Sequence, residues 1–121
     1  MTGLIERVII CLGGFFGAIG VATAAMASHG ENPRNLAAIS AICLAHGPAL
    51  LAVGLARRGR GLEAAALVLS AGTLVFAGDL ALREYAGQAL FPGAAPLGGG
   101  AMLLGWAGVV AWGLFAKFGR N

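Results

Sequence analysis

The sequence predicts an all-α protein, an integral membrane bundle of four antiparallel helices joined by short loops. Two observations lead to this prediction. The first is composition: of 121 residues, 59% are hydrophobic and only 11% are charged, whereas an ordinary soluble domain carries roughly 25% charged residues. A soluble chain of this size exposes a large share of its residues to water, and so few charges cannot cover that surface. We therefore expect a single membrane domain over residues 1–121.

The second observation is that four mainly apolar stretches each have the length of a membrane-spanning helix, which needs about 20 residues. These stretches cover residues 8–27, 36–56, 62–82 and 97–116. Four spans of this length account for most of the chain, so the connections between them must be short.

The breaks between the stretches carry residues typical of turns and helix starts. Asn32 is expected to cap a second helix that has Pro33 in its first turn, because proline has no amide to leave unpaired there. Residues 57–61 form a short basic turn with two glycines, and Pro92 and Gly93 mark a longer third connection. Consecutive spans are therefore expected to be antiparallel neighbours.

The basic residues predict how the chain is oriented. With four spans, the amino end, the middle turn and the carboxyl end share one side of the membrane. That side holds Arg7, Arg57, Arg58, Arg60, Lys117 and Arg120, and the opposite side holds only Arg34 and Arg83. Since basic loops stay in the cytoplasm, we expect a multi-pass protein of the cell inner (plasma) membrane with both termini cytoplasmic.

Small residues recur along each span at steps of three and four. Inside lipid the hydrophobic effect does not drive one helix onto another, so close packing through small side chains takes over. We expect the helices to pack at Gly13, Gly17, Gly20, Gly47, Gly98, Gly105 and Gly108. Such close packing argues against a wide aqueous pore, which polar residues would have to line.

His46, near the middle of the second span, is a candidate ligand or relay residue, because ionisable groups inside a membrane are costly and often functional. It could relay protons, bind a metal together with Cys43, or hydrogen-bond a quinone or a lipid headgroup. A structural role is the alternative. In that role a neutral His46 would bond to Ser70 or Thr73 on a neighbouring helix.

A second group of ionisable residues, His29, Asp79 and Glu84, is expected near the opposite membrane surface. His29 and Asp79 are candidate ligand or relay residues, and a metal site would need these two to converge, with Glu84 as an optional third ligand. The alternative is structural: Asp79 and Arg83 are four residues apart and can pair on one face of a helix. No metal-binding, catalytic or phosphate-binding motif is present, so we expect no cofactor, no metal and no catalytic residues.

Several short segments resemble a family of small membrane proteins. They are 27–30 (Ala-Ser-His-Gly), Ala45-His46, 76–80 (Phe-Ala-Gly-Asp-Leu), 96–99 (Pro-Leu-Gly-Gly) and Gly105-Trp106. In order and spacing they resemble the bacterial domain-of-unknown-function 423 family, which is related to the eukaryotic transmembrane protein 256. The chain departs from that pattern in its short first loop, in Gly47-Pro48 after His46 and in Asp79, where the family has a small hydroxyl residue. The resemblance implies a four-helix membrane protein with no assigned reaction.

Two functional hypotheses remain open. The first is a non-enzymatic accessory or assembly subunit, which packs its small-residue faces against a larger membrane complex or against copies of itself. The second is a binder or relay for a small molecule, lipid, quinone or metal, which uses His46 and the His29 and Asp79 group. An enzyme is not favoured, because no nucleophile, base and orienting group are matched. We expect contact with membrane lipids but not with nucleic acid, because the basic residues are dispersed without stacking aromatics.

Overall fold

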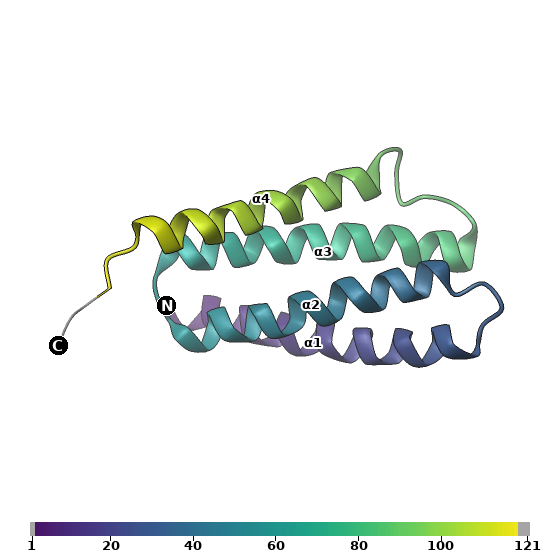
Figure 1. Cartoon of the computed structure of the whole chain (residues 1–121), viewed down its shortest axis with the longest axis horizontal. Coiled ribbons are helices and arrows are strands. Elements are labelled where there is room, and N and C mark those ends of the chain that lie inside the picture. The colour runs from purple at the N-terminus through teal and green to yellow at the C-terminus, as the bar shows by residue number, and fades with distance from the viewer. Residues whose placement is uncertain (1, 119–121) are drawn as a thin grey trace.

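The computed structural model describes residues 2–118, and four helices account for nearly all of them (Figure 1). The helices are α1 (Thr2–His29), α2 (Arg34–Ala56), α3 (Arg60–Ala86) and α4 (Ala94–Phe115). All four are long and apolar enough to cross a membrane. The chain is therefore a multi-pass helical membrane protein, as its composition predicts.

The helices are arranged as two antiparallel hairpins placed side by side. Helix α1 packs on α2, α4 packs on α3, and α2 joins the hairpins by packing on α3, whereas α1 touches α3 only sparsely. Figure 1 shows α3 between α4 and α2. Within the described residues the backbone of α4 lies against α3 alone, which leaves most of the surface of α4 uncovered.

The two ends of the bundle differ in charge. The amino end, the α2–α3 turn and the end of α4 lie together (Figure 1). We call this the basic end, because it holds Arg7, Arg57, Arg58, Arg60 and Lys117, whereas Arg120 lies outside the described residues. The α1–α2 and α3–α4 connections form the opposite end, which we call the loop end.

Glycines let the backbones of α1 and α2 touch. A Cβ atom on Gly13 would lie 2.9 Å from the carbonyl oxygen of Gly47, and one on Gly20 would lie 2.6 Å from the side chain of Leu44. The Ser40 hydroxyl donates a hydrogen bond of 2.7 Å to the Gly20 carbonyl across the same interface. A side chain at either glycine would push the helices apart and break these contacts.

The α3–α4 hairpin repeats this arrangement with the same spacing. A Cβ atom on Gly72 would lie 2.8 Å from the Gly98 carbonyl oxygen, and one on Gly105 would lie 2.7 Å from the Leu69 side chain. In each hairpin the outer helix supplies two glycines seven residues apart, and the central helix supplies a leucine followed three residues later by a glycine. Both hairpins therefore close by backbone contact.

Gly17 and Gly108, the other two predicted packing glycines, are less tightly enclosed. A Cβ atom on Gly47 would lie 3.0 Å from the backbone nitrogen of Gly17, but one on Gly17 itself would meet nothing within 4 Å in the described chain. Gly17 therefore takes part in the contact through its backbone. A Cβ atom on Gly108 would make an ordinary contact of 3.4 Å with the Ala65 side chain.

Helix ends differ from the prediction in three respects. The helices extend beyond the apolar stretches at most ends, because polar residues continue the backbone hydrogen bonding outside them. The expected Asn32 cap is wrong: α2 begins at Arg34 after Pro33, with no side-chain cap. The fourth span was expected to end at Ala116, but α4 ends at Phe115, where the backbone becomes extended.

The Gly72–Gly98 contact predicts a position-specific effect of a single methyl group. Gly98→Ala should lower the free energy of unfolding in detergent by about 1–3 kcal/mol, the usual cost of overpacking. The added Cβ would lie 2.7 Å from the backbone nitrogen of Phe76, which cannot move without shifting α3. The matched control is Gly99→Ala, because nothing in the described chain lies within 4 Å of a Cβ atom added at Gly99. The control should leave the free energy of unfolding unchanged or raise it. An equal loss of unfolding free energy in both variants would contradict the role of the Gly72–Gly98 contact.

Candidate functional site

His46 lies buried in α2 with both ring nitrogens hydrogen-bonded. Its Nδ1 lies 2.8 Å from the Ile42 carbonyl oxygen, and its Nε2 accepts a hydrogen bond of 3.0 Å from Trp106 Nε1. Because a carbonyl only accepts, the proton must be on Nδ1, and His46 is the neutral tautomer. This bond ties α2 to α4, whose backbones do not otherwise meet in the described chain.

The partners expected for His46 on the third span are wrong. The Ser70 hydroxyl donates to the Ala66 carbonyl at 2.8 Å, and the Thr73 hydroxyl donates to the Leu69 carbonyl at 2.7 Å. Both hydroxyls therefore bond within α3. With both ring nitrogens engaged, the geometry of His46 favours a structural fastener over a metal ligand or a proton relay.

Asp79 is fully buried and holds the α3–α4 connection in place. Its Oδ2 accepts a hydrogen bond of 2.8 Å from Arg83 Nε, and its Oδ1 accepts one of 2.8 Å from the backbone N–H of Leu90. The predicted pairing of Asp79 with Arg83 is confirmed. The bond to Leu90 was not predicted, and it fixes the connection to the last turns of α3.

The structure does not bring the other ionisable residues of the loop end together with Asp79. Glu84 instead accepts a hydrogen bond of 3.3 Å from Asn35 Nδ2 on α2, and His29 is exposed at the end of α1. Within residues 2–118, no three His, Cys, Asp or Glu side chains converge as a metal site requires.

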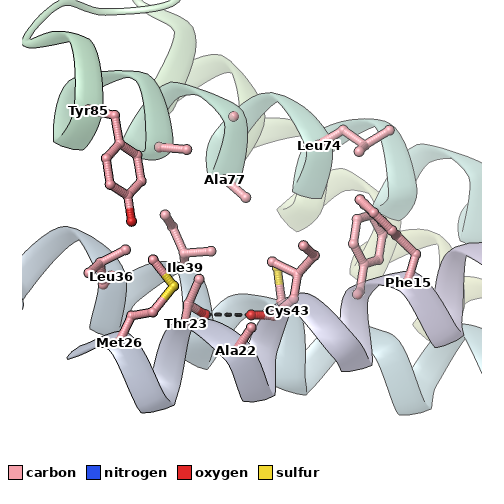
Figure 2. Close-up of a pocket in the computed structure, with 14 residues that line it drawn as sticks. Phe15, Ala22, Thr23, Met26, Leu36, Ile39, Cys43, Leu74, Ala77 and Tyr85 are labelled. Carbon is pink, nitrogen blue, oxygen red and sulfur yellow. Dashed lines mark hydrogen bonds between the residues drawn. The ribbon is translucent and has the colours of Figure 1, made fainter. Parts of the chain in front are cut away.

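An apolar groove of about 380 Å³ lies between α1, α2 and α3, toward the loop end. Figure 2 shows the Tyr85 ring reaching from α3 into this groove, with its hydroxyl directed toward Leu36 and Met26. The Thr23 hydroxyl, one of the few polar groups in the wall, already donates to the Ile19 carbonyl at 2.7 Å. An apolar groove of this size is suited to a hydrocarbon chain.

Two buried glutamates, which were not among the sequence candidates, form a second polar site at the basic end. Glu6 of α1 and Glu63 of α3 are only 9% and 7% exposed, and their carboxyl groups lie within hydrogen-bonding reach of each other. A sequence signal existed. Glu63 lies inside the third apolar stretch, and the antiparallel order places both residues at the same end of the bundle.

The hydrogen bond between Trp106 and His46 can be measured with a double-mutant cycle. Trp106→Phe and His46→Ala should each destabilise the protein, and the coupling energy should be about 0.6 kcal/mol and at most about 1.7 kcal/mol. Trp112→Phe, on the same helix, is the control and should show no coupling to His46→Ala. Unfolding in mixed detergent measures all variants, and additive losses at positions 46 and 106 would contradict the fastening role.

Comparison with known protein families gives a match that covers most of the membrane-spanning region. No curated protein and no solved structure matches the chain. The family described as "Protein of unknown function (DUF423)" matches residues 16–99, from the middle of α1 to the start of α4. The matched region contains His29, His46 and Asp79. Since it covers more than half of the chain, this protein belongs to the DUF423 family of proteins of unknown function.

Proposed function

We propose that this protein is a non-enzymatic assembly subunit whose α4 pairs with α4 of a second copy of the chain. The observation that carries the proposal is an uncovered seam along α4. Its residues are Leu97, Gly100, Leu104, Ala107, Ala111 and Leu114. All six are exposed, and successive members are alternately three and four residues apart. This spacing is the one that lets two helices interlock side chains along a left-handed crossing.

The side chains of this α4 seam are suited to close helix pairing in lipid. Its three leucines are 60–72% exposed, and its small residues leave room between them. Nothing in the described chain lies within 4 Å of a Cβ on Gly100. Glycine costs about 1 kcal/mol relative to alanine in a helix, and no contact of Gly100 among the described residues offsets that cost. A partner helix would offset it by close approach.

A second copy is the partner that this seam fits most simply. A twofold axis perpendicular to the membrane would place two α4 helices side by side and parallel, so each seam residue would face its own counterpart. The leucines and small residues of one copy could then interdigitate with those of the other. No charged residue lies between Ala94 and Phe115 to oppose this contact.

The orientation of the protein also belongs to this proposal. We place the basic end in the cytoplasm and both termini with it, in the cell inner membrane. The excess of Lys and Arg at this end supports the assignment, because basic segments are retained on the cytoplasmic side.

Bulky substitutions along the α4 seam should separate the copies. In lipid nanodiscs or mild detergent the unmodified protein should sediment as a dimer, and Gly100→Leu/Ala107→Leu should sediment as a monomer with an unchanged helix content. Gly14→Leu is the matched control, since Gly14 lies on α1 with nothing within 4 Å of its Cβ, and it should remain dimeric. A monomeric unmodified protein in several mild environments would contradict the proposal.

The groove between α1, α2 and α3 favours a second candidate function, the binding of a lipid tail. Its wall is almost entirely apolar, and a bilayer supplies hydrocarbon chains at high local concentration. This version of the binding hypothesis does not use His46, whose ring nitrogens are both engaged. The Tyr85 side chain, 66% exposed at the edge of the groove, could contact the polar part of the same lipid.

Filling the groove should remove the bound lipid without unfolding the protein. Ala77 of α3 lines the groove (Figure 2), and Ala77→Phe places an aromatic ring where the tail would lie. Native mass spectrometry from membranes should show lipid on the unmodified protein and little or none on this variant. Ala41→Phe, on an exposed position of α2, should retain the lipid. Equal lipid on both variants would contradict this candidate.

A further inference from the structure

The carboxyl groups of Glu6 and Glu63 join two helices that otherwise make few contacts. Glu6 lies about one turn into α1, and Glu63 lies in the first turn of α3. Both residues are more than nine-tenths buried, and their carboxyl groups lie within hydrogen-bonding reach of each other. The pair therefore lies where α1 and α3 meet at the basic end, and these two helices make few other contacts.

The charges around this pair do not neutralise it by direct contact. The single ion pair within residues 2–118 joins Arg83 to Asp79 at the loop end, so neither glutamate lies within 4.0 Å of a basic nitrogen there. The charged groups that face the pair are Arg57, which follows α2, and Arg60 at the start of α3. They act on the glutamates only over a longer distance.

Two carboxyl groups this close together need a proton or a metal cation between them. If both were ionised they would repel each other, and neither could donate a hydrogen bond to the other. Glu6 Oε1 is also buried without a hydrogen-bond partner in the described part of the chain. The site therefore has one acceptor oxygen, Glu6 Oε1, without a hydrogen bond among the described residues. When both groups are ionised, the site also carries one more negative charge than when one group is protonated.

A proton fits this site better than a metal ion does. Calcium takes six to eight oxygen ligands, and magnesium requires a nearly ideal octahedron. Two carboxyl groups supply at most four oxygens, and no third acidic, histidine or cysteine side chain joins them in the described residues. A single proton needs only two oxygens, one to carry it and one to accept the hydrogen bond.

We propose that Glu6 and Glu63 form a proton-binding site, in which one proton shared between the two carboxyl groups closes α1 onto α3 at the basic end. When the proton leaves for the water at this end, both groups carry a negative charge and α1 separates from α3. The site is independent of the α4 seam and of the groove.

An apolar carbodiimide tests this proposal on the intact protein in nanodiscs. Dicyclohexylcarbodiimide reacts with a protonated carboxyl group by adding its O–H across the C=N bond, and the adduct rearranges to a stable N-acylurea that peptide mass spectrometry locates. Label is expected on Glu6 or Glu63 at neutral pH, and it should fall as the pH rises and the proton is lost. Asp79 is an internal control. It is buried as well, but its hydrogen bonds to Arg83 and Leu90 need no proton on the carboxylate, so it should stay unlabelled.

Substitution of either glutamate distinguishes two explanations for a protonated carboxyl group. The proton is either shared between the two groups or held by one group because that group is buried. In Glu6→Gln the amide can donate the hydrogen bond, so Glu63 can accept it as a carboxylate, and labelling of Glu63 should fall by about tenfold. Glu63→Gln should have the same effect on Glu6. Absence of label on both glutamates of the unmodified protein at every pH would overturn the proposal, as would labelling that sodium suppresses at constant pH, because a bound cation would explain that result. The unmodified protein alone decides the test if a variant does not fold.

Discussion

Contact between helix backbones is the constraint on which the rest of this structure depends. In a bilayer the hydrophobic effect does not distinguish a helix surrounded by lipid from one surrounded by other helices, so stability has to come from packing. Gly13 against Gly47 and Gly72 against Gly98 bring carbonyl oxygens within reach of the facing helix. Both hairpins close in this way, and these contacts set the spacing between the paired helices.

Buried polar groups then act as fasteners between elements that glycine contacts do not join. The indole of Trp106 reaches His46 and ties α4 to α2, and Asp79 fixes the α3–α4 connection through Leu90. Each of these groups has its hydrogen bonds filled, as low-dielectric surroundings require. The Glu6 and Glu63 pair differs, because it holds α1 to α3 only while it also holds a positive charge. His46 and Asp79 therefore stabilise the fold, whereas we propose that the Glu6 and Glu63 pair responds to pH.

The surfaces left over by this packing are where function can be sought. Among residues 2–118, helix α4 has a single backbone neighbour, and the space between α1 and α3 is only partly filled. Both features are apolar and lie on helices long and apolar enough to span a membrane, which is why we propose that a second helix or a lipid chain occupies them. Membership of the DUF423 family places the chain among proteins of unknown function, so a role in association stays our proposal.

The sequence by itself determined the number of helices, their antiparallel order and the pairing of Asp79 with Arg83. These features depend on local quantities: the length of apolar stretches, the position of turn residues and the four-residue repeat of a helix. Only the tertiary structure decided that His46 bonds to Trp106, that Glu6 meets Glu63, and that α4 lies at the edge. In a span that is apolar on every side, hydropathy does not mark which face turns inward. The rotation of each helix about its axis is therefore set by contacts between residues distant in the chain.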